Sequence, residues 1–99
     1  MQLLFNSTTL TRPTAETLRE YGTRRFEQLN RYLPKWNKEF SVRITVHKER
    51  HLFVVCVELT LPTRLVIKAR HEDLRAAIDN AYSMLRNMLL RRKDRLSYH

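Results

Sequence analysis

The spacing of apolar and polar residues changes several times along this 99-residue chain, and each change marks a predicted element. Residues 3–5 form an apolar run before a turn-rich segment, which predicts a short strand that ends near Asn6. Residues 40–47 alternate apolar with polar, as a strand with one solvated face does, and residues 52–59 are apolar in both phases. Residues 64–69 predict a further strand, and short connections predict that the last three strands form an antiparallel meander.

Two segments instead have the spacing of amphipathic helices. The first is predicted over residues 14–33, with Thr14 as its N-cap, and Asp73 is the predicted N-cap of the second. Gly22 within the first helix costs about 1 kcal/mol relative to Ala, which indicates close packing against the sheet. The apolar stripes are Leu18, Gly22, Phe26, Leu29 and Leu33 in the first helix, and Leu74, Ala77, Ile78, Ala81, Leu85, Met88 and Leu89 in the second.

The element order is therefore β-α-β-β-β-α, in a single domain over residues 1–99, because a chain of this length can build one core. Two amphipathic helices and a sheet with one apolar face predict an α+β two-layer sandwich, in which both helices pack on one face of four strands. Val54, Cys56 and Val66 would then form an apolar patch on the open sheet face if their strand neighbours face the helices.

Charge narrows the kind of partner. The chain has 19 Lys and Arg against 10 Asp and Glu, a formal net charge of +9, and 14 of the basic residues are Arg. Arg can bind two phosphate oxygens at once through its planar fork. We therefore expect a polyanionic partner, RNA or DNA, and an anionic membrane surface is the weaker alternative. A module of two helices and one sheet fits RNA read by shape and backbone better than DNA.

Most basic residues have an ordinary explanation, and a few do not. Arg24 and Arg31 each follow a glutamate by four residues, which predicts stabilising pairs on the helix surface. Arg25 has no acidic neighbour on its own helix and is a candidate for binding a partner. Arg75 has Glu72 and Asp79 within reach on its helix, so ion pairing can explain it.

One flank and one end of the second helix carry unexplained charge. Arg75, Tyr82, Arg86 and Lys93 fall along one flank at about 100° per residue, which gives a basic row with an aromatic ring in it. Beyond the apolar stripe the helix is expected to project past the sheet into solvent. The end of this helix carries more basic residues than are needed to balance the helix dipole at a C-terminus. The excess predicts a phosphate-binding patch of Arg91, Arg92, Lys93 and Arg95.

Catalysis is not expected. The four histidines are scattered, and neither metal-ligand spacing nor a glycine-rich phosphate loop is present, so we expect no cofactor, no metal and no small-molecule substrate. His47 and His51 flank a tight turn, and a ribonuclease using them as acid and base is the enzymatic form to test. No segment is typical of a signal peptide or a membrane span, so we expect a cytoplasmic protein, and Cys56 among apolar residues indicates a packed thiol.

Four stretches of the chain resemble the ribosome hibernation-promoting factors, the family also called ribosome-associated inhibitor A or protein Y. They are the opening MQL, the helix TLREYGTRRFEQLNRYL, the strand HLFVVCVELTLP, and the segment from HEDLRAAID through LRRKDRL. AAID and KDRL are the most specific of these motifs. This chain departs from the family pattern in SMLRNML, where Met84 and Asn87 stand in place of a usual Lys and Arg.

The resemblance implies the same β-α-β-β-β-α fold and a non-enzymatic role. Members bind the small ribosomal subunit of the 70S ribosome against 16S ribosomal RNA, where they occupy the channel for messenger and transfer RNA and keep idle ribosomes inactive. By position, the RNA contacts carry over to Arg25, Arg91, Lys93 and Arg95, and Arg92 stands where members often have another basic or polar residue. Since nothing follows His99, the chain resembles the short form, which would need a separate factor to make ribosome dimers.

Two other functions remain open. A general double-stranded RNA binding module has a similar layout and would bind free duplex RNA as well as ribosomes. A protein-interaction module would instead use the apolar patch on the open sheet face. Salt separates the two kinds of contact, because phosphate binding weakens as salt rises and an apolar contact does not.

Overall fold

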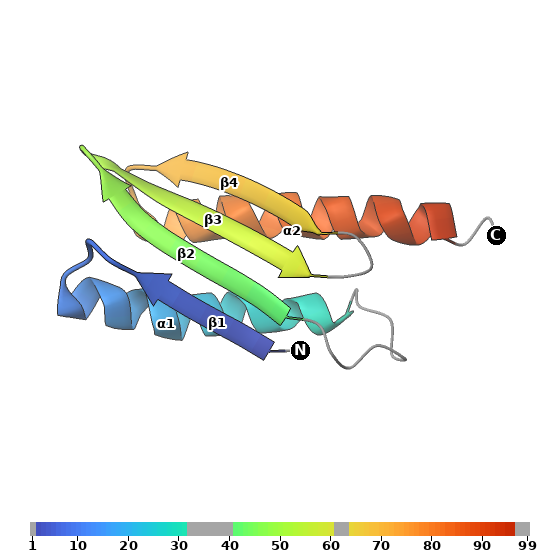
Figure 1. Ribbon diagram of the computed structural model, residues 1–99, viewed down its shortest axis with the longest axis horizontal. Helices are drawn as coiled ribbons and strands as arrows, with labels where there is room; N and C mark the ends of the chain where they lie inside the picture. The colour runs from blue at the N-terminus through green and yellow to red at the C-terminus, as the bar shows by residue number, and fades with distance from the viewer. Residues whose placement is uncertain (1, 32–40, 61–63, 97–99) are drawn as a thin grey trace.

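The protein folds into two layers, a four-stranded sheet and a pair of helices that cover one of its faces (Figure 1). The computed structural model describes residues 2–31, 41–60 and 64–96, and in the last of these segments the side chains through residue 91. The predicted α+β sandwich and its element order are confirmed. The elements are β1 (Gln2–Ser7), α1 (Arg12–Phe26), a 3-10 helix η1 (Glu27–Arg31), β2 (Ser41–Glu49), β3 (Leu52–Thr60), β4 (Leu65–His71) and α2 (Leu74–Leu96).

The strands lie in the order β1-β2-β3-β4. β3 pairs antiparallel with both β2 and β4, so the predicted meander is confirmed. β1 pairs in parallel with β2, with Leu3 beside Val42 and Phe5 beside Ile44. Because parallel neighbours need a crossover connection, α1 carries the chain back along the sheet between them. Both helices therefore run in the same direction across one face of the sheet (Figure 1).

Alternation along the strands determines which side chains form the core. Val42, Ile44 and Val46 of β2 are fully buried against the helices, as the two-residue period predicts. Val55 and Val57 of β3 join them in the same apolar cluster. The helices contribute the matching stripe, and its buried members are Leu18, Gly22, Phe26, Leu29, Leu74, Ala77, Ile78, Ala81, Tyr82, Leu85 and Leu89.

At Gly22, α1 packs closely against the side chain of Phe5 in β1. A Cβ atom at this position would lie 2.7 Å from Cε1 of Phe5, which is too close for two carbon atoms. The ring of Phe5 thus fills the space that any larger residue would need. The predicted reason for a glycine inside the apolar stripe is confirmed.

The predicted N-terminus of the first helix is wrong by two residues. α1 begins at Arg12, with Thr11 at the N-cap position and Pro13 inside the first turn. Proline is tolerated there because the first turn leaves its N–H groups without helical partners in any case. Thr14 lies within the helix, and its hydroxyl is 2.8 Å from that of Thr11.

The two helices end differently. α1 ends at Phe26 and continues as the tighter η1 through Arg31, while Leu33, the last predicted stripe residue, lies outside the described residues. At the start of α2, Asp73 Oδ2 accepts a hydrogen bond of 3.0 Å from the backbone N–H of Ala76, which confirms the predicted cap. α2 then extends well past the strands, as predicted (Figure 1).

Candidate nucleic-acid interface

Three of the predicted basic residues meet at the seam between α1 and α2. Residues 21 and 25 are one turn apart on α1, and residues 75, 79, 82 and 86 recur at the spacing of one flank on α2. Since the helices lie side by side, these positions face one another across the seam. We call this group the inter-helix arginine cluster, and its members are Tyr21, Arg25, Arg75, Asp79, Tyr82 and Arg86.

Asp79 joins the two helices within this cluster. The hydroxyl of Tyr21 donates a hydrogen bond of 2.7 Å to Oδ1 of Asp79. The same oxygen lies 3.1 Å from Nε of Arg25, in an ion pair that is about one-third exposed to solvent. The hydrogen bond to this carboxylate is the main reason that the pKa of Tyr21 is raised above 10.0.

Each arginine of the cluster lies on an aromatic ring. Cζ of Arg25 is 4.7 Å from the ring centroid of Tyr82, and Cζ of Arg86 is 5.8 Å from the same ring. Cζ of Arg75 is 5.6 Å from the ring of Tyr21. Such contacts stabilise by about 0.5–1 kcal/mol at exposed sites. All three guanidinium groups therefore lie beside tyrosine rings of the seam.

The ring of Tyr82 connects the cluster to the core. Its residue is 2% exposed, and its ring meets that of Phe26 edge to face, with 5.9 Å between centroids and 84° between planes. Phe26 is fully buried. Arg25 and Arg86 therefore contact a ring that packing holds in place.

The ion pairs of the cluster differ from those the sequence predicted. Glu72 lies 3.7 Å from Nε2 of His51, and Asp79 pairs with Arg25, so the expected pairing of Arg75 with these carboxylates is wrong. Arg75 contacts the ring of Tyr21 instead. The carboxylate partner of Arg25 lies on the other helix. Residue spacing along one helix predicts only pairs within that helix, so it could not predict this one.

The predicted pairs on α1 are absent as well. In the described part of the chain, neither Arg24 nor Arg31 lies within 4.0 Å of a carboxylate oxygen. Glu27 and Arg31 fall in η1, where about 120° per residue turns positions four apart away from each other. Glu20 and Arg24 are exposed, and exposed pairs gain little from closing. Both arginines thus remain part of the positive surface.

The basic end of α2 continues from the cluster along one helix. Arg91 is exposed, and the last core residue before it in the described segment is Leu89. The backbone of α2 runs on to Leu96 through Arg92, Lys93 and Arg95, whose side chains lie outside the described residues. Their roles remain predictions.

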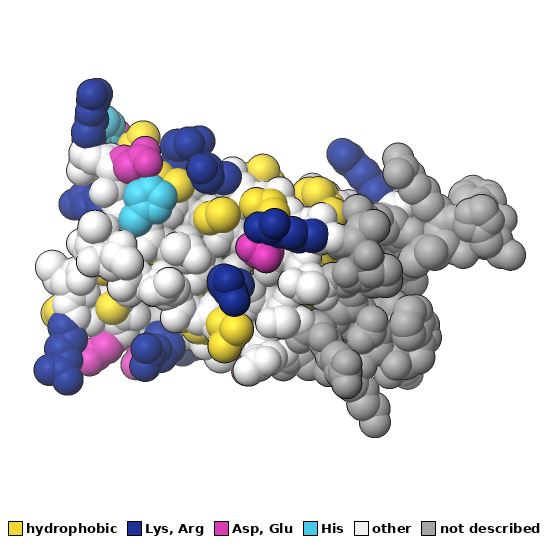
Figure 2. All heavy atoms as spheres, in the orientation of Figure 1, with side chains coloured by type: hydrophobic (Ala, Val, Ile, Leu, Met, Phe, Trp, Pro, Cys, Tyr) yellow, Lys and Arg dark blue, Asp and Glu magenta, His cyan; other side chains and the backbone are white. Residues whose placement is uncertain are grey.

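The open sheet face differs from the predicted apolar patch. Val66 is 49% exposed, but Val54 is fully buried and Cys56 is half-buried. Strand register places Val54 between His47 and Arg70 of the neighbouring strands. Figure 2 shows basic side chains spread between small apolar spots on this face. The predicted patch is therefore wrong, and the Cys56 thiol packs on the open face rather than in the core.

The histidines near the β2–β3 turn point to different partners. Nε2 of His47 is 2.9 Å from Glu49, and its hydrogen bond lowers the pKa of that carboxyl below 4.5. His51 lies near Glu72 of the segment before α2. Among the described residues, no group of three His, Cys, Asp or Glu side chains could hold a metal ion. No helix in the described segments is long and apolar enough to cross a membrane.

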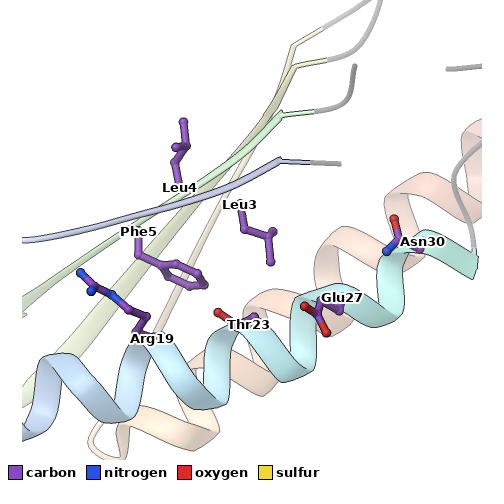
Figure 3. Close-up of a pocket in the computed structure, with 7 residues that line it drawn as sticks. All are labelled: Leu3, Leu4, Phe5, Arg19, Thr23, Glu27 and Asn30. Atoms are coloured by element: carbon purple, nitrogen blue, oxygen red, sulfur yellow. The ribbon is translucent and has the colours of Figure 1, made fainter. Parts of the chain in front are cut away.

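A groove lies between β1 and the outer side of α1 and η1 (Figure 3). Leu3 and Phe5 point from the strand toward the helix, and Leu4 points away. Arg19 and Glu27 on the helical side have opposite charges, so this groove offers a polyanion no excess of positive charge. None of the predicted site residues lines it; the lining consists of Leu3, Leu4, Phe5, Arg19, Thr23, Glu27 and Asn30.

Comparison with known proteins identifies the family. Residues 13–97 match the family described as Sigma 54 modulation protein / S30EA ribosomal protein. The chain belongs to this family. Over 84 residues this S30EA-family chain is 31% identical to the ribosome hibernation promoting factor of Salmonella typhimurium (strain LT2), an alignment that covers 85% of the chain and 86% of that protein. The resemblance found in the sequence is thus confirmed.

Solved structures confirm the fold of this S30EA-family chain. A ribosomal subunit interface protein from Coxiella burnetii superposes with a TM-score of 0.75 at 21% identity, covering 95% of the chain and 99% of that structure. The N-terminal domain of Protein Y from Thermus thermophilus also gives a TM-score of 0.75 at 21% identity, covering 92% and 98%. At this identity the likeness supports the shared fold.

Proposed function

We propose that the protein binds the small subunit of the 70S ribosome against 16S ribosomal RNA and blocks messenger and transfer RNA from the decoding channel of idle ribosomes. The inter-helix arginine cluster carries this proposal, because it brings three arginines together over tyrosine rings at one seam. Membership of the S30EA family and the name of the Salmonella relative support the ribosome as the partner. The proposed action is non-enzymatic and cytoplasmic.

The chemistry of the cluster suits a phosphate backbone. An arginine on an aromatic ring keeps its charge, and the N–H groups that point away from the ring can bind phosphate oxygens in pairs. Arg75, Arg86, Arg91, Arg92, Lys93 and Arg95 all lie on α2, which spans about 30 Å between the first and last of them at about 1.5 Å per residue. At about 100° per residue, Arg75, Arg86 and Lys93 share one flank of α2, whereas Arg91, Arg92 and Arg95 are placed around the other sides of its end. We therefore expect phosphate contacts along this flank and around the end of the helix.

The proposed mechanism is occlusion. A two-layer domain with a continuous apolar core resists deformation, so it can fill a channel as well as bind its wall. Phosphate contacts along α2 and Arg25 would hold it there. The domain then excludes the RNAs that need the same space, with no covalent step.

Cosedimentation with purified 30S subunits tests this proposal. Arg91, Arg92 and Lys93 are changed together to Glu, and pelleting is compared with that of the unchanged protein at low and moderate salt. We expect the variant to keep its circular dichroism spectrum and to lose pelleting. The affinity of the unchanged protein should fall with salt with a log–log slope of about −0.7 to −0.9 for each phosphate contact.

A matched control reverses the same number of charges elsewhere. Arg43, Lys68 and Arg70 lie on the open sheet face, and their change to Glu should leave most of the pelleting intact. Equal loss in the two variants would contradict a binding surface on the helices. Competition with free duplex RNA tests the general RNA-binding alternative, since a ribosome-specific factor should stay on 30S subunits when duplex RNA is in excess.

A further inference from the structure

We infer that Asp79 is a positioning residue of the RNA-binding surface, and that this negatively charged side chain strengthens binding to a polyanion by holding Arg25 in place. The inference rests on the proposed function and adds Asp79 to the residues that support RNA binding. The sequence alone predicted that Asp79 would pair with Arg75, whereas in the structure it pairs with Arg25. Asp79 belongs to the AAID motif, whose Ala77 and Ile78 are fully buried in the core. Packing explains these two apolar residues but does not explain the carboxylate.

The contacts of Arg25 show which part of its side chain is held. Nε is buried and lies 3.1 Å from Oδ1 of Asp79, in an ion pair that is not aligned as a hydrogen bond. The side chain as a whole is 32% exposed. Exposure therefore falls on other parts of the side chain than the nitrogen that faces Asp79. Nη1 makes a long contact of 3.5 Å with Gln28, which leaves the terminal edge of the guanidinium group able to bind a ligand.

Asp79 restrains Arg25 together with two rings. Tyr82 lies under the guanidinium group at 4.7 Å, and Tyr21 donates its hydroxyl hydrogen to the same Asp79 oxygen that faces Arg25. A free arginine loses considerable rotamer freedom when a ligand orders it. Here folding has already ordered the side chain, so binding costs less conformational entropy.

Electrostatics alone predicts that Asp79 weakens binding, which is the opposite of a positioning role. A carboxylate beside a phosphate-binding surface repels the ligand, so its removal should strengthen binding if charge alone matters. Three arginines of the cluster outnumber this one carboxylate, so the surface keeps a positive balance. The sign of the change on removing Asp79 therefore separates positioning from charge.

The test measures the affinity of fluorescently labelled protein for purified 30S subunits at one fixed salt concentration. We expect Asp79→Ala to weaken binding about tenfold, the equivalent of losing one charge-assisted contact. Asp79→Asn should weaken it less, because an amide oxygen still accepts the Tyr21 hydrogen bond. Glu20→Gln is the matched control: it removes an exposed carboxylate on α1, and binding should stay equal or tighten slightly.

A double-mutant comparison separates positioning from a merely structural role. In an Arg25→Ala background the change Asp79→Ala should not weaken binding further, because the residue that it positions is gone, and loss of the negative charge should leave affinity equal or slightly higher. An equal loss in both backgrounds would overturn the inference, as would unchanged or tighter binding of Asp79→Ala alone. Should Asp79→Ala fail to fold by circular dichroism, Asp79→Asn decides in its place. Failure of the unchanged protein to bind 30S subunits would instead contradict the proposed function.

Discussion

The helix seam and the open sheet face both carry basic residues, but they hold them differently. On the sheet face, Nη2 of Arg64 is 3.0 Å from Glu58, while Lys68 and Arg70 alternate with buried apolar residues along an edge strand. At the seam, each arginine lies on a tyrosine ring and Arg25 also contacts a carboxylate. The two surfaces therefore differ in how far contacts within the protein restrain their basic side chains.

The two surfaces should therefore play different parts in binding. Charge on either face raises the rate of encounter with a polyanion, and salt screens this effect within about 10 Å at 0.1 M. Contacts that persist in the complex need side chains whose geometry is already determined. Under the proposed function we therefore expect the seam to hold the bound RNA and the sheet face to contribute long-range attraction.

Charge reversal on each face is the strongest test of this comparison. Arg75→Glu with Arg86→Glu should weaken binding to 30S subunits about a hundredfold or more, since two phosphate contacts become two repulsions. Lys68→Glu with Arg70→Glu changes the net charge by the same amount and should weaken binding about two- to threefold. Equilibrium titration at one salt concentration measures both. Similar losses in the two variants would mean that total charge decides the affinity.

A charge-conserving exchange sharpens the comparison. Arg25→Lys keeps the charge but loses both the planar group on Tyr82 and the nitrogen that faces Asp79, so we expect about a fivefold loss of affinity. Arg70→Lys on the sheet face should leave affinity unchanged within error. If the seam tolerated lysine as well as the sheet face does, the orientation of its guanidinium groups would have no role in binding.

The smallest expected difference concerns stability at the two ends of the pH range. At the seam the pKa of Tyr21 is raised above 10.0, so the folded chain keeps a proton that the unfolded chain loses. This contribution is complete below pH 10 and disappears as pH rises through the raised pKa. Tyr21→Phe should remove that alkaline loss, as followed by urea unfolding between pH 9 and pH 11.

The strands should respond at acid pH instead. His47 donates to Glu49 and lowers the pKa of that carboxyl below 4.5, so the corresponding stability is present above pH 4.5 and is lost as pH falls through the lowered pKa. Glu49→Gln should flatten the acid side of the profile and leave the alkaline side unchanged. A change on the alkaline side would show that the two regions are coupled.

Local patterns predicted those features that depend on neighbours in sequence. Alternation from Val42 correctly predicted the core face of β2, and Asp73 was correctly predicted as the N-cap of α2. Gly22 predicted a close contact with the sheet, but only the structure identifies Phe5 as its partner. Thr14 was misplaced because Thr11 can also precede a helix and Pro13 fits the first turn. Each of these depends on the chemistry of a few consecutive residues.

Features that depend on packing between elements could not be predicted in the same way. Arg25 and Asp79 are far apart in sequence, and their ion pair requires the two helices to lie side by side in one register. The parallel pairing of β1 with β2 likewise needs α1 as a crossover. The predicted open-face patch is wrong because Val54, which lies between His47 and Arg70 of the neighbouring strands, is fully buried. Alternation within one strand does not reveal this.

The contact between Gly22 and Phe5 has a consequence one turn further along the same helix. A methyl group at residue 22 would have to displace either the ring or the helix, since it would come within 2.7 Å of Phe5. Displacing α1 would change the separation of Arg25 and Asp79, which is 3.1 Å and leaves little tolerance. The absence of a side chain at Gly22, in the interior of the protein, thus helps to determine the position of Arg25 at its surface.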